Sequence, residues 1–372
     1  MRLHRFLDPL LLALPRLAGR PGPTGGVLLV SGGGLGDTVM FARVLPRFLE
    51  LARPGERVTV LLRTDAARMA FLFPEGVTVK AVDFGRLREI GTRRRLFAEL
   101  YRAHYRLVVH TDYLRHPDLD EALVAAARAE EAAAMRPRPS PKHGRRLAAN
   151  LRLYRRVFDS GAVMTDKVVR LARFAAFLTG GDPTPPTIRL PEAQLPPPTE
   201  LPAPTVVLQP FSAVALKQSP PELWGRVIGA LPAGWQARIA GHPSDLDKNP
   251  AYRALLALPG VSFEPAPFKQ LAPILRAARL VVSVDTACMH LAAAVGAPTL
   301  CLASAAYVGE IVPYAPEVSP PNLTVLFSPC DRQGCLGDCR YPPEHGMYRC
   351  VAALDPEAVL AAVVDMCAGG TR

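Results

Sequence analysis

A glycine-rich turn that ends in a carboxylate is the first feature of the sequence that could do chemistry. Residues 31–37 (SGGGLGD) follow the apolar segment 26–30 and precede a helical pattern from about residue 37 to residue 52. A buried strand that leads into such a turn and then a helix places backbone N–H groups at the carboxyl edge of a sheet, where ligands bind. Four glycines in five residues also let another group approach the backbone closely.

The spacing of this turn differs from the two common phosphate-binding loops. In a G-x-G-x-x-G pattern that begins at Gly32, the sixth position is Asp37, and no Lys-Ser/Thr pair follows as in a Walker A loop. An acid here would repel a diphosphate, so we do not expect a plain dinucleotide site. Asp37 has two interpretations: a helix cap, worth about 1 kcal/mol, or a general base that takes a proton from an attacking hydroxyl. Its position alone favours the cap.

A second strand-to-helix junction lies at residues 280–290 (LVVSVDTACMH), with Asp285 and Thr286 at the helix start and His290 about one turn further on. Exposed N–H groups and the helix dipole make such an end a phosphate site. The Thr286 hydroxyl can add a donor, and Asp285 can cap the helix or accept from a sugar hydroxyl. His290 taken alone is more typical of a hydrogen-bonded core histidine.

Four cysteines cluster in a segment with little expected regular structure. They are Cys330, Cys335, Cys339 and Cys350, in a C-x4-C-x3-C-x10-C pattern. Four thiolates suit tetrahedral zinc or iron, although strong zinc motifs have a tighter C-x2-C spacing. Free thiols are the main alternative, and disulfides are a further one. Cys288 and Cys301 lie in apolar runs and are expected to pack in the core.

Strands alternate with helices in both halves of the chain, and this alternation must position the two junctions. In the first half we expect strands at 26–30, 57–62, 77–82 and 106–110, and helices at 37–52, 120–134 and 166–178. In the second half we expect strands at 206–208, 236–240, 261–263, 279–284 and 298–302, helices at 221–231, 249–258, 268–278 and 286–295, and a last helix opened by Asp355 and Pro356. The alternation predicts an α/β fold with parallel sheets covered on both sides.

The length of 372 residues predicts two to three domains at roughly 150 residues each. The proline-rich segment 191–204 (PEAQLPPPTELPAP) tolerates neither a helix nor a central strand and is interpreted as a stiff linker. We therefore expect one domain over 1–190 and a second over 205–372, the latter with a cysteine-rich loop at 328–350.

The amino-acid composition excludes several classes of protein. Apolar residues make up 49% of the chain, which argues against disorder. No run of 18 apolar residues lacks a charge or a proline, so a membrane-spanning helix is not expected. The absence of cysteine before Cys288 favours a reducing cytoplasm. Residues 1–18 faintly resemble a signal peptide, but Asp8, Pro9 and Pro15 interrupt them. A basic amphipathic segment that lies on the protein or on a membrane is the favoured interpretation.

Positive charge concentrates in two segments of the first half. The chain's net charge is 44 − 33 = +11; residues 86–106 supply +5 (seven Arg, two Glu) and residues 136–156 supply +8 (seven Arg, one Lys). These segments are either solvated helix faces or a docking surface for an anionic partner. A phosphorylated glycolipid, an anionic membrane and a nucleic acid all fit the charge. A low aromatic content of 7% and the lack of a known module count against nucleic acid.

Residues 32–48 (GGGLGDTVMFARVLPRF) and 280–302 (LVVSVDTACMHLAAAVGAPTLCL) resemble the heptosyltransferases, family 9 of the glycosyltransferases. The resemblance implies a GT-B fold of two Rossmann-like domains that face each other across a cleft. It implies that the C-terminal domain holds a nucleotide-diphosphate sugar, usually ADP-heptose, and the N-terminal domain a lipopolysaccharide core acceptor. Transfer would invert the anomeric centre. The enzyme would be cytoplasmic, with a peripheral contact to the inner membrane.

The resemblance also implies roles for individual residues. Asp37 matches the family's proposed base, on an acceptor-side loop that includes Gly34 and Gly36. On the donor side, the matching residues are Ser212, Lys217, Gly241, His242, Asp285, Thr286 and His290. Lys217 matches a phosphate-binding lysine, and Gly241 with His242 would lie near the base or ribose. The four-cysteine cluster loosely resembles an iron site of family members that act on proteins, so a structural zinc or iron ion is a hypothesis.

The chemistry is coherent with these roles, and no metal is required for catalysis. Cleavage of an anomeric C–O bond leaves a diphosphate, which Lys217 and the helix start at Thr286 can stabilise. The acidic pairs Asp118/Asp120 and Asp245/Asp247 each precede a helix and are interpreted as helix-start acids rather than a metal motif. Two alternatives stay open: a sugar-nucleotide hydrolase or epimerase, and a basic nucleic-acid-binding protein.

Overall fold

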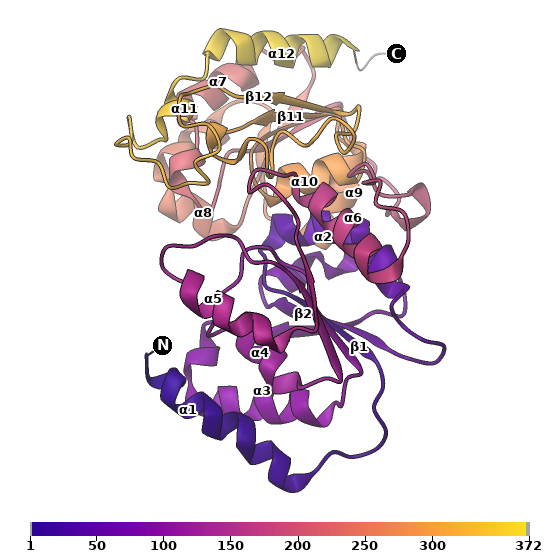
Figure 1. The fold of residues 1–372 in the computed structure, drawn as a ribbon. Coiled ribbons are helices and arrows are strands. Elements are labelled where there is room, and N and C mark those ends of the chain that lie inside the picture. Colours follow the sequence, from indigo (N-terminus) through magenta and orange to yellow (C-terminus); the bar gives the residue numbers. More distant parts are fainter. Residues whose placement is uncertain (1, 370–372) are drawn as a thin grey trace. The chain divides into compact units, whose positions relative to one another are not determined.

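The computed structural model describes residues 2–369, which form two compact units of the α/β class (Figure 1). Unit 1 holds the chain up to Val163 together with Val169–Thr184. Unit 2 holds Met164–Val168 and the chain from Pro185 onward. None of the helices within residues 2–369 is both long enough and apolar enough to cross a membrane.

In the described part of unit 1, six parallel strands form one sheet in the order β3-β2-β1-β4-β5-β6. The strands are β1 (Val27–Ser31), β2 (Val58–Arg63), β3 (Thr78–Val82), β4 (Leu107–His110), β5 (Glu131–Met135) and β6 (Arg156–Phe158). The inner strands β1 and β4 are buried along their whole length because helices cover both faces of the sheet. The chain moves outward from β1 to β3 and then returns to β4, so the strand order reverses between β1 and β4.

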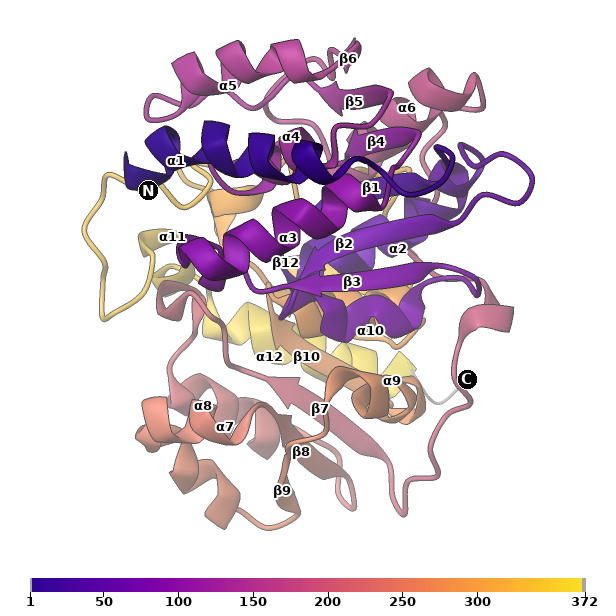
Figure 2. The same cartoon turned by 90° about the horizontal axis from the view of Figure 1, so that it is seen from below.

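The helices of unit 1 pack on both faces of this sheet (Figure 2). They are α1 (Arg2–Ala13), α2 (Leu35–Leu49), α3 (Ile90–Arg102), α4 (Asp120–Ala127), α5 (Gly144–Asn150) and α6 (Lys167–Thr179), whose first two residues belong to unit 2. On one face, Phe97 of α3 and Leu123 of α4 share a core with the strands, and Leu11 of α1 joins it. On the other face, Phe48 of α2 packs edge-on against Phe174 of α6.

Unit 2 repeats this plan, with its described strands in the order β12-β11-β10-β7-β8-β9, all parallel. The strands are β7 (Thr205–Gln209), β8 (Gln236–Ala240), β9 (Val261–Glu264), β10 (Leu280–Val284), β11 (Thr299–Leu302) and β12 (Leu323–Leu326). The helices are α7 (Pro221–Gly229), α8 (Pro243–Lys248), α9 (Phe268–Ala277), α10 (Ala287–Ala294), α11 (Arg349–Ala352) and α12 (Pro356–Gly369). Trp224 of α7 and Val359 of α12 lie fully buried on one face. The strand order reverses between β7 and β10.

The predicted α/β class is confirmed, but two of the predicted elements are wrong. The helix expected over 120–134 ends at Ala127, and residues 131–135 form strand β5. Arg128 adopts a left-handed φ of 43°, which stops the helix. Ala133 and Ala134 then lie fully buried in the sheet, so tertiary packing overrides the helix propensity of alanine. The helix expected over 249–258 is instead a 3-10 segment, η7 (Pro250–Ala257).

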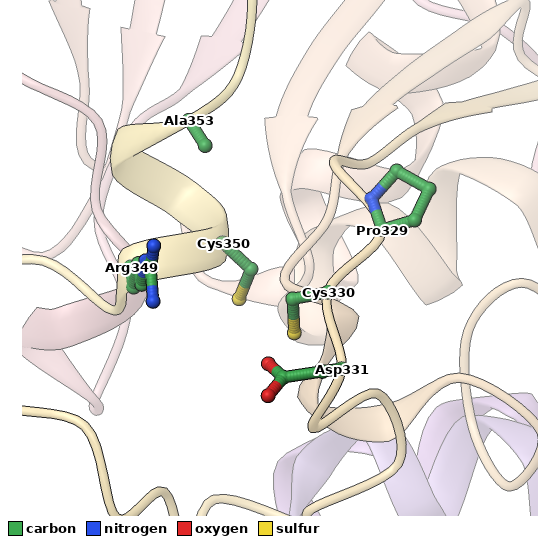
Figure 3. Close-up of a pocket in the computed structure, with 6 residues that line it drawn as sticks. All are labelled: Pro329, Cys330, Asp331, Arg349, Cys350 and Ala353. Carbon is green, nitrogen blue, oxygen red and sulfur yellow. The ribbon is translucent and has the colours of Figure 1, made fainter.

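The four clustered cysteines lie in the irregular segment between β12 and α11 and in α11 itself. Cys330, Cys339 and Cys350 belong to one apolar cluster with Tyr348. Cys330 and Cys350 line a pocket of about 430 Å³ whose wall also contains Asp331 and Arg349 (Figure 3). The core positions expected for Cys288 and Cys301 are confirmed, since both are buried and burial raises the pKa of the Cys288 thiol to about 12.

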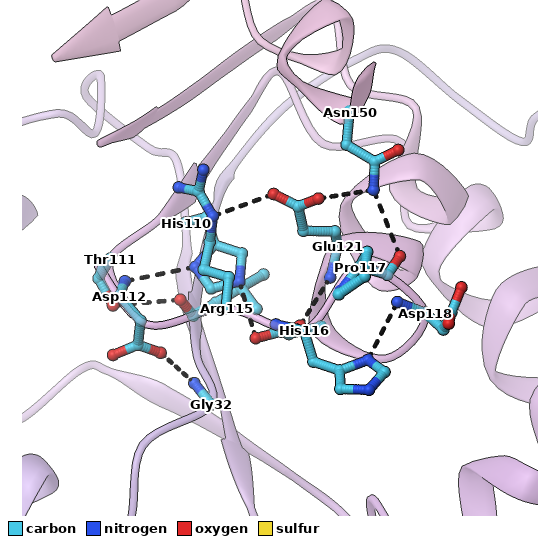
Figure 4. A network of polar contacts seen from close by, with 12 residues as sticks. Gly32, His110, Thr111, Asp112, Arg115, His116, Pro117, Asp118, Glu121 and Asn150 are labelled. Atoms are coloured by element: carbon cyan, nitrogen blue, oxygen red, sulfur yellow. Dashed lines mark hydrogen bonds and ion pairs between the residues drawn. The ribbon is translucent and has the colours of Figure 1, made fainter. Parts of the chain in front are cut away.

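A buried polar network follows β4 in unit 1 (Figure 4). The fully buried Glu121 of α4 lies 3.0 Å from Nε of Arg115, and its Oε2 accepts a hydrogen bond of 2.6 Å from Asn150. Arg115 also donates from Nη1 to the Met135 carbonyl at 2.7 Å, which ties this network to the end of β5. Asp118 forms an ion pair with Arg146. These contacts fix the chain that follows β4 against α4 and α5.

We predict that Glu121→Gln lowers the opening free energy of unit 1 by about 3–5 kcal/mol, because Arg115 then stays buried without a counter-charge. Native-state hydrogen exchange of the β4 and β5 amides measures this opening free energy. The matched control is Glu99→Gln, which removes the exposed carboxylate of the Lys80–Glu99 pair and should cost less than about 1 kcal/mol. Equal effects of the two variants would show that the buried pair does not hold unit 1 together.

Candidate functional site

In unit 1, the loops after β1 and β4 meet at the point where the strand order reverses. The N–H of Gly32, which follows β1, donates a hydrogen bond to Oδ2 of Asp112, which follows β4. Asp112 is buried, and the neighbouring Thr111 donates from its hydroxyl to the Val30 carbonyl at 3.1 Å. In open α/β sheets, ligands bind beside the carboxyl ends of the strands at such a reversal. The glycine loop therefore lies where this fold places ligands.

Asp37 lies in the first turn of α2, close to this loop. Its Oδ2 accepts a hydrogen bond of 2.7 Å from the Gly34 N–H, as a capping residue does. A Cβ atom added to Gly33 would lie 2.6 Å from the Asp37 Cβ, so only glycine fits there without a shift. Gly36 belongs to the first turn of the same helix. The N-cap position predicted for Asp37 is wrong, because Gly34 is the N-cap and Asp37 is the third residue of α2, but its carboxylate still caps the helix start and lies beside the loop.

In unit 2, the corresponding reversal point holds an ion pair. Lys217 ends the 3-10 turn η6 (Ala215–Lys217), which follows β7, and its Nζ lies 2.6 Å from Oδ1 of Asp285, which follows β10. Lys217 also lies 4.2 Å from the centre of the Tyr307 ring. Two residues 68 positions apart in the sequence are therefore brought together at the carboxyl ends of the neighbouring strands β7 and β10.

Asp285 is held by a second partner. Its Oδ2 accepts a hydrogen bond of 2.9 Å from the Ser304 hydroxyl, which follows β11. Burial raises the pKa of the Asp285 carboxyl, while the Lys217 ammonium and the Ser304 hydrogen bonds oppose the increase. Asp285 can therefore keep Lys217 in place beside the start of α10, provided that the carboxylate is ionised.

Thr286 and His290 take different positions on α10. Thr286 is the N-cap residue with extended backbone, and its side chain makes no capping hydrogen bond to the helix. His290 is buried one turn further on, and its Nδ1 shares a short hydrogen bond with the hydroxyl of Tyr314. Burial raises the pKa of that hydroxyl well above its ordinary value. His290 thus has the hydrogen-bonded core environment that the sequence alone suggested.

The remaining predicted donor-side residues follow β7 and β8. Ser212 accepts at its hydroxyl from the Val214 N–H at 3.2 Å. Gly241 has Phe211 above it, whose ring would lie 2.8 Å from an added Cβ atom. His242 is the exposed N-cap of α8, and its N–H donates to Asp245 at 2.8 Å. None of the hydrogen bonds and ion pairs described for these three residues reaches Lys217 or Asp285.

Of the four acids interpreted as helix-start acids, Asp120 and Asp245 have the partners of such residues, whereas Asp247 lies near the end of α8. Asp245 completes the capping box of α8, and Asp247 pairs with Arg253 at 2.6 Å. Asp120 begins α4 and accepts from the His116 N–H at 2.7 Å. Asp118, by contrast, is a buried partner of Arg146, a role that its spacing did not indicate.

Sequence analysis missed Asp112, Ser304, Tyr307 and Tyr314. Asp112 and Ser304 each come two residues after a strand that was predicted from the alternation of strands and helices. This position just after a strand is the sequence signal that could have identified them. Tyr307 ends the short 3-10 turn η8 (Ala305–Tyr307) and Tyr314 lies in irregular chain after it, so no periodicity indicates which way either side chain points. They were found only through their contacts with Lys217 and His290.

Comparison with protein families matches residues 121–338 to the model of glycosyltransferase family 9 (heptosyltransferase). The chain belongs to this family. The matched range contains Lys217, Asp285, Thr286 and His290, whereas Asp37 precedes it. No curated protein sequence matches the chain significantly.

Solved structures show that this family 9 glycosyltransferase has the GT-B fold. Escherichia coli heptosyltransferase WaaC, solved with ADP-2-deoxy-2-fluoro heptose, is 20% identical; the match covers 91% of this chain and 99% of WaaC, with a TM-score of 0.64. The E. coli ADP-heptose lps heptosyltransferase II is 16% identical over 93% of this chain and 100% of its own, with a TM-score of 0.61. The iron-containing dodecameric glycosyltransferase TibC from enterotoxigenic E. coli is 14% identical over 94% of this chain and 76% of its own, with a TM-score of 0.50.

We predict that Lys217→Met destabilises the protein by about 3 kcal/mol at neutral pH, where the ionised Asp285 loses its cation. Without Lys217 the already raised pKa of Asp285 rises further, because burial is less opposed. The loss should therefore shrink as the pH falls through that raised pKa, since a protonated carboxyl needs no cation.

The difference in melting temperature between the wild type and Lys217→Met, measured from pH 8 to pH 4, checks this prediction. The double variant Lys217→Met/Asp285→Asn should show little pH dependence, and Lys248→Met serves as an exposed lysine control in the same unit. A stability loss that is constant across this pH range would contradict the proposed coupling of the two groups.

Proposed function

We propose that the protein is an inverting glycosyltransferase that moves heptose from ADP-heptose to a lipopolysaccharide core sugar or another anionic glycoconjugate. The observation that supports this proposal most directly is the pairing of Lys217 with Asp285 at the start of α10. A cation beside a helix N-terminus suits the diphosphate of a nucleotide sugar. The ADP-heptose analogue in the WaaC structure supports the choice of donor, and the similar ADP-heptose lps heptosyltransferase II supports the choice of acceptor.

On the donor side, we propose that Lys217 and the N–H groups of α10 stabilise the departing diphosphate. Negative charge develops on the phosphate oxygen as the anomeric C–O bond breaks, so a fixed cation and helix dipole lower the barrier. Asp285 holds the ammonium in position, and Thr286 supplies a hydroxyl at the helix start. Ser212, Gly241 and His242 would contact the rest of the nucleotide sugar, and His290, oriented by Tyr314, would support the helix start from within.

On the acceptor side, we propose that Asp37 is the general base. Its carboxylate takes the proton of the acceptor hydroxyl while that oxygen forms the new bond to the anomeric carbon and ADP leaves with the bonding electrons of the old one. Attack from the face opposite the diphosphate inverts the anomeric centre. The Gly34 hydrogen bond engages Oδ2 and fixes the carboxylate, so capping and catalysis are compatible in one residue. This step needs no metal ion, because Lys217 and the helix start provide the positive potential.

The acceptor is proposed to be an anionic glycolipid at the cytoplasmic face of the inner membrane. Support comes from the arginine-rich segments 86–106 and 136–156, both in unit 1, which also contains Asp37. Arginine recognises phosphate and carboxylate groups in two-point hydrogen bonds, which suits a phosphorylated core oligosaccharide. A peripheral contact with the membrane would follow from the location of such an acceptor.

The test is transfer of heptose from ADP-heptose to a heptose-deficient core acceptor, compared between the wild type and Asp37→Asn. We expect Asp37→Asn to retain donor binding within about twofold and to lose at least about 100-fold in kcat, as expected when a general base is removed. The control is Asp247→Asn, which alters an exposed aspartate that pairs with Arg253 outside the proposed site. NMR of the new glycosidic linkage determines whether the anomeric centre is inverted.

Two outcomes would overturn the proposal. Asp37→Asn turnover within tenfold of the wild type would remove Asp37 as the base. Release of free sugar from ADP-heptose, unaffected by any acceptor, would instead indicate a sugar-nucleotide hydrolase. A melting-temperature screen with ADP-, UDP- and GDP-sugars identifies the donor independently, because a ligand that binds the folded state raises its melting temperature.

We further propose that Cys330, Cys335, Cys339 and Cys350 bind a structural iron or zinc ion. The donor set fits such an ion, and the similar glycosyltransferase TibC is an iron-containing protein. Within the described residues, however, no three His, Cys, Asp or Glu side chains are arranged to hold a metal, so the segment would have to close around it. Burial raises the pKa of the Cys335 and Cys350 thiols, and binding would therefore release protons.

For the protein purified without chelator, we predict about one equivalent of iron or zinc by elemental analysis. Cys335→Ser/Cys339→Ser should lose the metal, because two of the four thiolates are removed, and should lower the melting temperature. The matched control is Cys288→Ser, which alters a buried cysteine outside the cluster. Metal-free protein with an unchanged melting temperature in the presence and absence of chelator would refute a metal site here.

A further inference from the structure

The first helix of the chain is attached to unit 1 by one side only. On its inner side, Leu11 is buried in the core that α3 and α4 share. Asp8 of α1 forms an ion pair of 2.6 Å with Arg93 of α3, and the Arg93 side chain is fully buried. Arg93 also donates to the Asp118 carbonyl at 2.9 Å. These contacts fix which side of α1 points away from unit 1.

The outward side of α1 and of the following turn η1 (Leu14–Ala18) is apolar. Phe6 is 81% exposed, Leu10 57%, Leu14 40% and Leu17 87%. Their spacing of four, four and three residues places them on one stripe of a helical segment. Scattered exposed leucines are normal, but a continuous stripe headed by an exposed phenylalanine marks an interaction site. We call these four residues the apolar stripe.

Exposed arginines lie on η1 and on the neighbouring helix α3, and we call them the arginine border. α3 packs against both α1 and η1, and Figure 2 shows α1 and α3 on the same side of unit 1. Arg94, Arg95 and Arg102 of α3 are exposed, as is Arg16 of η1. Among the described residues no carboxylate forms an ion pair with these four, whereas Arg86 on the turn before α3 is paired with Glu89. The border is therefore strongly basic.

We propose that the apolar stripe and its arginine border form a docking surface for an anionic lipid bilayer. Phenylalanine and leucine side chains on one stripe of a helix lying parallel to the membrane enter the boundary between headgroups and acyl chains. Arginines beside the helix then contact the phosphates of anionic lipids. Only the purpose of this surface rests on the proposed function. That purpose is to bring unit 1 to an acceptor embedded in the membrane.

The two halves of this surface together select a lipid partner. A second copy of the chain could cover the apolar stripe, but a symmetric contact would bring the two arginine borders together and cost electrostatic repulsion. A nucleic acid would satisfy the arginines and leave the apolar stripe in water. An anionic bilayer offers apolar chains and negative headgroups at the same boundary, and it therefore matches both features.

The test is co-sedimentation of the full chain with vesicles of phosphatidylcholine alone or with phosphatidylglycerol at a third of the lipid. We expect binding to the anionic vesicles that weakens as salt increases, and little binding to the neutral ones. Phe6→Ser/Leu17→Ser should reduce binding by about tenfold or more, since two of the most exposed apolar side chains are lost. The matched control is Val364→Ser, an exposed apolar residue on α12 that should bind as the wild type does.

Sedimentation velocity and a soluble acceptor separate the remaining outcomes. If the wild type binds neither vesicle, or if Phe6→Ser/Leu17→Ser binds as well as the wild type, the proposal is wrong. If the wild type is a dimer that this double variant dissociates, the apolar stripe is an interface between copies instead. Transfer to a delipidated acceptor should be unchanged in the double variant, so loss of membrane binding and failure of the proposed transfer reaction give different results.

Discussion

A carboxylate buried at the end of a central strand must be neutralised or hydrogen-bonded, and both units meet this constraint where their strand order reverses. Asp112 in unit 1 accepts from the Gly32 backbone, and Asp285 in unit 2 is paired with Lys217 and bonded to Ser304. An unpaired charge at such a depth would cost several kcal/mol. Buried acids therefore help to hold the loops that carry the proposed chemistry.

The two acids are bound to different groups, and this difference agrees with the two roles in the proposed reaction. Asp112 accepts a hydrogen bond from the Gly32 N–H, which helps to fix the glycine loop beside which Asp37 is proposed to act as the base. The ammonium bound by Asp285 keeps a positive charge at the start of α10, where a phosphate would bind. One sheet plan, used twice, thus carries both parts of the proposed reaction: proton removal in unit 1 and anion stabilisation in unit 2.

The local sequence pattern was sufficient to predict the α/β class, most strands and the two strand-to-helix junctions. At each junction the strand end, the turn and the helix start lie within about ten residues of one another. It failed where the outcome depends on distant residues. Ala133 and Ala134 became a strand because β4 and β6 lie beside them. Asp112 and Ser304 acquire a role only through Gly32 and Asp285, which lie far from them in the sequence. Family resemblance, rather than spacing, singled out Lys217 before its partner was known.

The contact between Gly33 and Asp37 has a consequence for how mutational data on this enzyme should be interpreted. An added methyl group at Gly33 would overlap the Asp37 Cβ, although the glycine has an ordinary backbone and no functional group. Even the smallest side chain there must displace the carboxylate or the loop. In a saturation scan scored by product formation, substitutions of Gly33 would thus be tolerated as poorly as substitutions of a residue that touches substrate. Their effect would come from steric exclusion alone.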